Sequence, residues 1–377
     1  MSDVPHLRFP EFSGEWEKYT IGDLCEEFKS GKNIKAESIQ EEGVYPVFGG
    51  NGLRGYTDRY NHDGDYVLIG RQGALCGNVR FVTGKTYITE HAIAAKATND
   101  NYTRYLEYLF VRLNLGQFSD QSAQPGLAVN KLLKIETYVP SKAEQLKIAF
   151  LLRLLDERIA TQNKIIEKLQ SLIKGLNDNI HKGIKGETVC FSDLGEAYSG
   201  LSGKGGDDFG YGEPFITYMN VYQNTYISEK DYELVQIAPN EKQNSVQYGD
   251  ALFTLSSETP EEVGIGAVYL GNTQKLYLNS FCFGIHFYDE RVLPQYLAHF
   301  ISSSSFRRAI YPLAQGSTRF NLQKNDFMKM KFLLPSLEKQ GHIANTLDAL
   351  HCRLANEKSL TEQYILLKKY LLSLMFI

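Results

Sequence analysis

Apolar side chains recur at alternating steps of four and three residues along two stretches of the chain. The first stretch runs from Ile148 to Ile180 and the second from Ile343 to Leu374. This spacing puts the apolar positions on one narrow stripe of a helix and is typical of a coiled-coil seam. Neither helix can bury its stripe alone, so we expect the two to pair in antiparallel, with a globule at each end. The expected seam positions are Ile148, Leu152, Leu155, Ile159, Ile166, Leu169, Leu347, Leu350, Leu354, Leu367 and Leu371.

A polar residue interrupts each stripe near its middle. Gln162 stands in the first seam and Glu357 in the second. After Glu357 the next apolar position, Leu360, comes three residues later where four are due, which indicates a local stammer. A single polar seam residue can fix the register of a coiled coil. A solvated defect at the helix centre is an equal alternative.

The regions outside these helices alternate short apolar runs with turns rich in Gly and Asn, as β-strands do. Each region also carries one short helical pattern near its end, at residues 106–113 and 297–301. We therefore expect two mixed α/β globules. The expected strands are residues 45–48, 65–70, 78–82, 215–219, 251–255, 266–270 and 278–286.

The second half of the chain repeats the first. Pro140 and Gln145 recur as Pro335 and Gln340, an offset of 195 residues. The fold class that follows is two pseudo-repeated α/β domains separated by two long helices that form an antiparallel coiled coil. The predicted segments are a globule at 1–140, a central helix at 141–186, a second globule at 187–335 and a C-terminal helix at 336–377.

Composition excludes several classes of protein. With 377 residues and 43% hydrophobic residues, the chain is long and apolar enough for two or three folded domains. Its five cysteines are widely spread and form no C-x-x-C pair, so zinc and redox motifs are absent. The N-terminus lacks the features of a signal peptide, and the apolar runs are too short to span a bilayer. We expect a cytoplasmic protein with reduced thiols.

Common catalytic motifs are also missing. Gly50–Gly55 fits G-x-G-x-x-G, but no helical pattern follows it, so Asn51-Gly52 is better explained as a hairpin turn. The sequence has no P-loop, no Asn/Asp-Pro-Pro-aromatic signature of amino-methyltransferases and no G-x-S-x-G elbow. The eight histidines show no metal-ligand spacing. We therefore expect no catalytic residue and no metal site.

An ordered set of segments resembles the DNA-specificity (S) subunit of type I restriction-modification enzymes, over essentially the whole chain. The segments are Val4–Phe12 with Trp16-Glu17, Gly49–Gly52, Gly64–Gly70, Gly249–Thr254, Ser256–Glu262, and the helix border of Pro140-Ser141, Glu144-Gln145, Ile148-Ala149 and Asp156. The second border departs from the pattern, because Lys339 stands where Glu144 is in the first copy and His351 where Asp156 is. These departures put the local helix contacts in doubt.

The resemblance implies a non-catalytic subunit whose globules are target recognition domains, each reading one half of a bipartite site in double-stranded DNA. The two helices would set the separation of the half-sites and dock two modification (methyltransferase) subunits, in a system that also holds restriction (translocase and nuclease) subunits. No cofactor is expected on this chain. S-adenosylmethionine would act on the modification subunit, and ATP and Mg²⁺ on the restriction subunit.

Charge limits how such a chain could bind DNA. Residues 1–140 carry a net charge of −3 and residues 187–335 one of −6, so any DNA-binding surface must be a local cluster. Arg and Lys read guanine, and Asn and Gln read adenine, when rigid elements hold them in the major groove. Tyr218 and Tyr222 are further candidates, either to stack on a base or to contact phosphate, and a place in the core is the alternative for both. The candidate DNA-binding residues are Lys32, Asn51, Arg54, Arg71, Gln72, Gln124, Lys204, Ser256, Ser257, Thr259, Gln315, Ser317, Thr318 and Arg319, with ordinary solvated loops as the alternative.

Two other functions fit the same pattern. A coiled-coil protein-interaction scaffold without DNA specificity would share the helices and globules but give no methylation phenotype. An unrecognised hydrolase with a site in the Gly-rich loops would show activity from this chain alone. The recognition hypothesis predicts neither property, but a DNA motif that changes when loops such as 71–73 or 315–319 are exchanged.

Overall fold

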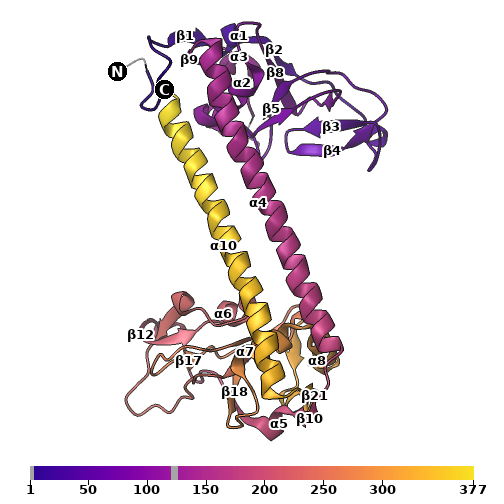
Figure 1. The fold of residues 1–377 in the computed structure, drawn as a ribbon, viewed down its shortest axis with the longest axis vertical. Helices are drawn as coiled ribbons and strands as arrows, with labels where there is room; N and C mark the ends of the chain where they lie inside the picture. The colour runs from indigo at the N-terminus through magenta and orange to yellow at the C-terminus, as the bar shows by residue number, and fades with distance from the viewer. Residues whose placement is uncertain (1–3, 120–125) are drawn as a thin grey trace. The chain divides into compact units, whose positions relative to one another are not determined.

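The computed structural model describes residues 4–119 and 126–377 and divides the chain into two compact units (Figure 1). The first unit comprises Met1–Asn163 and Ser359–Ile377, and the second Lys164–Lys358. Each unit therefore joins one globule with a segment of each long helix. The sequence division at 140 and 335 separates helices from globules, whereas these units follow the contacts that each globule makes with the helices.

The first globule is built from one antiparallel sheet, one mixed sheet and one small antiparallel pair. A four-stranded sheet has the order β2-β8-β5-β6, a three-stranded sheet the order β4-β3-β7, and β1 pairs with β9. Figure 1 shows the hairpin of β3 and β4 standing out from the body of this unit. The strands are β1 Glu17–Thr20, β2 Cys25–Ser30, β3 Tyr45–Gly49, β4 Gly52–Thr57, β5 Tyr66–Gly70, β6 Val79–Val82, β7 Tyr87–Ile88, β8 Ala92–Ala97 and β9 Glu136–Val139.

The second globule repeats this topology. Its sheets have the orders β11-β18-β14-β16 and β13-β12-β17, β10 pairs with β21, and a further sheet, β15-β20-β19, is added. The strands are β10 Glu187–Cys190, β11 Gly195–Ser199, β12 Phe209–Ile216, β13 Tyr232–Val235, β14 Ala251–Thr254, β15 Ser256–Ser257, β16 Gly266–Val268, β17 Tyr277–Leu278, β18 Cys282–Phe287, β19 Ala314–Gln315, β20 Phe320–Leu322 and β21 Lys331–Leu334.

Two long helices and several short ones complete the chain. The long helices are α4, Lys142–Lys182, and α10, Leu337–Met375. In each globule one helix covers the central sheet, α2 (Thr103–Leu113) in the first and α7 (Pro294–Ser302) in the second. The short helices are α1 Ile21–Leu24, α3 Val129–Leu132, α5 Phe191–Leu194, α6 Tyr218–Gln223, α8 Ser304–Ile310 and α9 Lys324–Met328.

Two of the expected strands need correction. The strand predicted at 215–219 ends at Ile216, because the Thr217 side chain caps the backbone N–H of Asn220 and starts helix α6. Tyr218 and Tyr222 are therefore helical, one turn apart, and their rings stack with centroids 6.0 Å apart. The strand predicted at 278–286 is two strands, β17 and β18, separated by a turn that Asn279 stabilises with its side chain.

The paired segments of α4 and α10 in the first unit run antiparallel, as predicted. Lys368 Nζ lies 2.5 Å from Asp156 Oδ1, and Arg158 Nε donates to the Tyr364 hydroxyl at 3.4 Å. Successive contacts thus pair increasing residue numbers in α4 with decreasing residue numbers in α10. The pairing encloses the apolar surface of the first core together with Leu372 and Met375 from the last turns of α10.

The expected stammer after Glu357 is wrong, and so is the seam position Leu367, whose side chain is 43% exposed. The steps of three and four continue without a break through Glu357, Thr361, Tyr364, Lys368, Leu371 and Met375, which are buried or half-buried. The seam includes polar side chains here, because Lys368 pairs with Asp156 and lies over the Tyr108 ring.

The other expected seam residues occupy this inner face. Ile148, Leu152, Leu347 and Leu354 are buried, and Leu155, Ile159, Ile166, Leu169, Leu350 and Leu371 are half-buried. Gln162 is 1% exposed and Glu357 5%, so neither is the solvated defect that the sequence left open.

A buried glutamine at the start of each long helix ties that helix to its globule. Gln145 Nε2 donates to the Pro140 carbonyl at 3.0 Å, and its oxygen accepts from the Tyr102 N–H at the start of α2. Gln340 makes the equivalent bonds to Pro335 and to Leu293, which precedes α7. Each glutamine thereby satisfies backbone groups that a helix start leaves unpaired.

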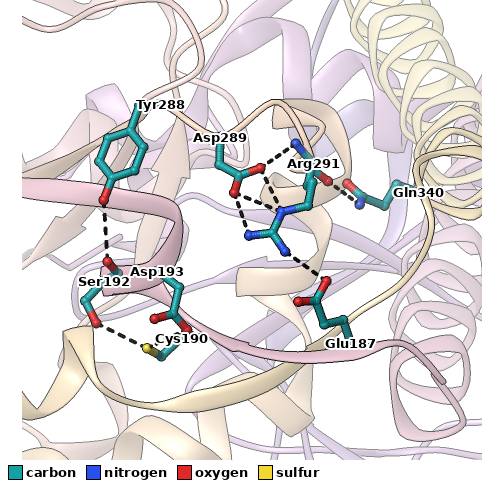
Figure 2. A network of polar contacts seen from close by, with 8 residues as sticks. All are labelled: Glu187, Cys190, Ser192, Asp193, Tyr288, Asp289, Arg291 and Gln340. Carbon is teal, nitrogen blue, oxygen red and sulfur yellow. Dashed lines mark hydrogen bonds and ion pairs between the residues drawn. The ribbon is translucent and has the colours of Figure 1, made fainter.

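A network around Arg291 reinforces the second of these junctions (Figure 2). The Arg291 guanidinium binds both oxygens of Asp289 and donates to Glu187 at 2.8 Å, at the start of β10. The Arg291 carbonyl accepts from Gln340 Nε2 at 2.7 Å. The loop that leads into α7 is thus held to both β10 and α10.

The departure at His351 is compensated by a neighbouring residue. In the first unit the Tyr108 hydroxyl donates to Asp156 at 2.8 Å. In the second unit His299 takes the place of Tyr108 and donates to Asp348 at 2.7 Å, while its ring stacks on His351. The carboxylate has moved by one turn of α10, and the contact between helix and globule is kept. Lys339, at the other departure, is exposed.

Three histidines at this junction predict a pH-dependent stability. Burial lowers the pKa of His181, His299 and His351, so the folded chain keeps them neutral where the unfolded chain, with a pKa near 6.5, takes up protons. The free energy of unfolding should therefore fall as the pH drops below about 6.5. Urea unfolding at pH 7.5 and 5.5 measures this. His181→Leu should reduce the slope by up to about 1.4 kcal/mol per pH unit, and an unchanged slope would contradict the assignment.

The described residues lack a membrane-spanning helix, a cluster of metal ligands and a disulfide. Across residues 4–119 and 126–377, no helix combines the length and apolar character needed to cross a bilayer. In the same residues no group of His, Cys, Asp and Glu is placed to bind a metal ion. All five cysteines are free thiols.

Candidate nucleic-acid interface

In the first globule the candidate residues lie where the central strand β5 leaves its sheet. The Arg71 N–H donates to the His91 carbonyl at 2.9 Å, and the Arg71 carbonyl accepts from the Leu127 N–H at 2.9 Å. Gln72 then forms an isolated bridge with Gly126. These backbone bonds fix Arg71 and Gln72 at the edge of a rigid sheet, as the sequence predicted.

The hairpin of β3 and β4 closes one side of this edge. Asn51, Arg54, Gln72 and His91 line one depression together with the Gly49 and Gly50 backbone. Gly50 permits this approach, because a Cβ there would lie 2.7 Å from the His91 carbonyl oxygen. The predicted hairpin is present, but its loop is Gly50-Asn51 and not Asn51-Gly52, because Gly52 already pairs with Gly49 as the first residue of β4. Gly52 has φ of +106°, which favours glycine.

The remaining candidates of the first globule differ in their surroundings. Arg71 is half-buried, and its Nε has no hydrogen-bond partner within the described residues. Lys32 is exposed just after β2. Gln124 lies outside the described residues. Arg80, which the sequence analysis missed, reaches across to the Gly52 backbone and adds a positive charge beside the hairpin.

In the second globule the extra sheet β15-β20-β19 gathers the candidates. Ser256 and Ser257 form β15, Gln315 ends β19, and residues 316–319 connect β19 to β20. Gln315, Ser317, Thr318 and Arg319 are exposed. Gly316 has φ of +146°, so this turn requires a glycine.

The two serines are buried and serve the framework of this surface. The Ser257 hydroxyl donates to Glu262 at 3.1 Å, and the Ser256 carbonyl accepts from the Tyr218 hydroxyl at 2.9 Å. Tyr222 donates to the same Glu262 at 2.8 Å, and this bond holds the pKa of that carboxyl below its usual range. The two tyrosines thus brace the sheet from helix α6.

Arg307 fixes the loop that carries the exposed Thr259. Its guanidinium donates to the carbonyls of Glu261, Val263 and Gly264 at 2.6–2.8 Å. Burial lowers the pKa of Arg307 to about 10. Nothing in the sequence distinguishes Arg307 from the exposed Arg308 beside it, apart from the helical phase of α8.

Lys204 is not part of this sheet. Its ammonium pairs with Glu241 at 2.6 Å and donates to the Gln236 carbonyl. The Lys204 bond is the largest cause that lowers the pKa of Glu241 to about 2. The structure therefore gives Lys204 a role in closing the loop of residues 236–241.

The same backbone pattern locates both surfaces. The Leu255 N–H donates to the Phe281 carbonyl, and the Leu255 carbonyl accepts from Leu322, each at 2.8 Å. Leu255 is therefore the counterpart of Arg71, and Ser256 that of Gln72. In the first globule the exposed Gln72 lies at this point, and in the second the exposed candidates lie on the adjoining sheet β15-β20-β19 and at Thr259.

Comparison with known proteins adds a family to this geometry. Residues 13–171 and 186–363 match the family model of the type I restriction modification DNA specificity domain. The EcoprrI specificity subunit of Escherichia coli is 41% identical over 154 residues, which is 40% of this chain and 38% of that protein. A putative type I specificity subunit of Haemophilus influenzae is 22% identical over 353 residues, 84% of this chain and 82% of that protein.

Solved structures share the fold. The S subunit of a type I restriction-modification system from M. genitalium covers 99% of both chains, with a TM-score of 0.65 and 16% identity. A structure from work on the assembly of a type I R-M system covers 96% of this chain and 97% of its own, with a TM-score of 0.60 and 13% identity.

Proposed function

Because this chain belongs to the family of type I restriction modification DNA specificity proteins, as a non-catalytic specificity subunit, we propose that each globule reads one half of a bipartite site in double-stranded DNA. The long helices would set the distance between the half-sites. The first globule would read through Asn51, Arg54, Arg71 and Gln72, and the second through Thr259, Gln315, Ser317, Thr318 and Arg319.

The observation that supports this most is that the candidate surfaces lie at equivalent positions in the two globules. Where the central strand leaves its sheet, the same backbone bond recurs in both globules; the first presents Arg71 and Gln72 there, and in the second Arg319 lies beside Phe281, which makes that bond. A rigid sheet edge with projecting Arg, Asn and Gln suits direct reading of base edges in the major groove. Sequence-specific contact also fits the acidic globules, since little affinity would come from a general positive field.

The chain itself would hold no cofactor. Its partners would be two methyltransferase subunits, which use S-adenosylmethionine to methylate adenine N6, and restriction subunits, which use ATP and Mg²⁺. This division is supported by the absence of every common catalytic motif from the sequence.

Sequencing of N6-methyladenine tests this function. A methylation-free host expresses the partner methyltransferase with and without this chain. A bipartite motif that requires the chain is expected, and it would give both half-sites and their gap. No motif, with a methyltransferase that is active on another specificity subunit, would overturn the proposal and favour the scaffold.

A hollow in the first unit supports the docking of a methyltransferase subunit. Leu146, Phe150 and Leu154 lie one turn apart on α4 and are 43–53% exposed. Phe150 lines a hollow together with the apolar residues Phe81, Leu146 and Ala149. That surface suits a partner that presents an apolar side chain. The charged lining residues are Asp65, Arg104, Lys147 and Arg153, and the three basic ones pair with Glu107, Glu11 and Glu157.

Phe150→Asp is therefore expected to abolish copurification of the methyltransferase subunit. The change buries an unpaired charge in the interface, and we expect a loss of affinity of about 100-fold or more. Val44→Asp, at an equally apolar residue that is 71% exposed, is the matched control and should bind normally. Equal binding by the two variants would exclude this face as the docking site.

A further inference from the structure

His91 and Phe281 occupy the same place in the two globules. Each gives its carbonyl to the residue that follows the central strand, at 2.9 Å from Arg71 and 2.8 Å from Leu255. Each also comes directly before the strand that pairs with the central one, β8 or β18. The equivalence rests on backbone bonds, and the side chains are free to differ.

Phe281 lies against a candidate base-reading residue. Its ring is 53% exposed, so its position is not explained by the hydrophobic core. The guanidinium carbon of Arg319 lies 5.4 Å from the ring centroid, a cation–π distance. Among the described residues no hydrogen bond or ion pair holds Arg319, and the Phe281 ring is the side chain that its guanidinium contacts. A guanidinium held over a ring keeps its N–H groups available for guanine O6 and N7.

His91 stands in the same relation to Gln72. Its Nδ1 lies within hydrogen-bond distance of Gln72 Oε1 at 3.3 Å, and its Nε2 lies 3.1 Å from Glu90 Oε1. The bond fixes the plane of the Gln72 amide. The second lone pair of Oε1 and both hydrogens of Nε2 remain available, which is the set needed for adenine N6 and N7.

We propose that residues 91 and 281 are the positioning residues of the two recognition surfaces: Phe281 holds Arg319 toward a guanine in one half-site, and His91 holds Gln72 toward an adenine in the other. This inference rests on the proposed function. The inference adds which side chains determine specificity and which base each of them reads. It also names the neighbouring residue that orients each of these side chains.

The test compares single and double variants in the complete methyltransferase complex. Once the wild-type motif is known, methylation rates are measured on DNA with each of the four bases at every position. Arg319→Ala should reduce the preference for guanine at one position by about 5- to 150-fold. Phe281→Ala should reduce it about two- to five-fold, and Phe281→Trp should retain it. Phe281→Ala should have no further effect in the Arg319→Ala background, because the ring acts through Arg319.

His91→Ala is the matched control in the other globule. It should relax an adenine position in the opposite half-site and leave the guanine position unchanged. The positioning role would be overturned if one of these single variants lost base preference equally at both half-sites. Additive effects of Phe281→Ala and Arg319→Ala would overturn it as well. The positioning role would also be overturned if the wild-type chain gives a clear motif and Phe281→Ala leaves that motif unchanged. A wild-type chain with no motif would instead overturn the proposed function itself.

Discussion

A chain with one extra heptad in each long helix is expected to direct methylation to a site whose half-sites lie about three base pairs farther apart. Seven residues add about 10.5 Å to a helix, and B-DNA rises about 3.4 Å per base pair. A whole heptad preserves the steps of three and four, which run unbroken through the polar positions Glu357 and Lys368. The insertions follow Leu169 in α4 and Leu354 in α10, both in the second unit.

Sequencing of N6-methyladenine measures the new gap. Both half-sites should keep their bases, since neither recognition surface is altered. A chain with the heptad in α4 alone is the control and should lose activity, because its seam no longer matches that of α10. An unchanged gap in the double insertion would contradict the role of the helices as a spacer.

Phe191→Ala is expected to destabilise the second unit by about 3–5 kcal/mol, the range for removing a large core aromatic side chain. Phe191 is fully buried and lies at the centre of an aromatic cluster. Its ring stacks on Phe327 at 5.0 Å and lies 4.8 Å from Phe332 and 6.1 Å from Phe253. A loss of this size is a large part of the stability of an ordinary domain.

Urea unfolding monitored by hydrogen exchange measures this effect unit by unit. Amides of the second core should lose protection, while those of the first core, which shares no side chain with it, should keep theirs. Phe209→Ala, at an exposed ring of the same globule, should change stability by no more than about 0.5 kcal/mol. A loss under about 1 kcal/mol in Phe191→Ala would show that Phe191 is not central to the core.

The sequence predicted the helices and most strands because each depends on a local period. The seam of α10 differs from the prediction where polar residues, and not the predicted leucines, occupy the inner face of the helix. Leu360 and Leu367 looked like the continuation of the stripe, but Thr361 and Lys368 occupy it, the latter because Asp156 neutralises its charge. A hydrophobic pattern contains no information about such a partner on another helix.

The candidate surfaces could be predicted only in part, for a similar reason. Arg71-Gln72 was recognisable because it directly follows a strand, and 315–319 because it is a polar segment with a glycine. That Lys204 pairs with Glu241, or that Arg307 holds three carbonyls, depends on contacts between distant segments. His91 and Phe281 became visible only when the backbone bonds of the two globules were compared.

The glutamine at each helix border has a consequence for how the sequence of this protein can evolve. Gln340 bonds to backbone atoms of residues 291, 293 and 335, and Gln145 to those of residues 102 and 140. A border that depends so largely on main-chain atoms accepts an incoming globule of foreign sequence, provided that its backbone follows the same course. If each globule reads one half-site, as proposed, recombination between the borders would replace one half of the motif in a single event.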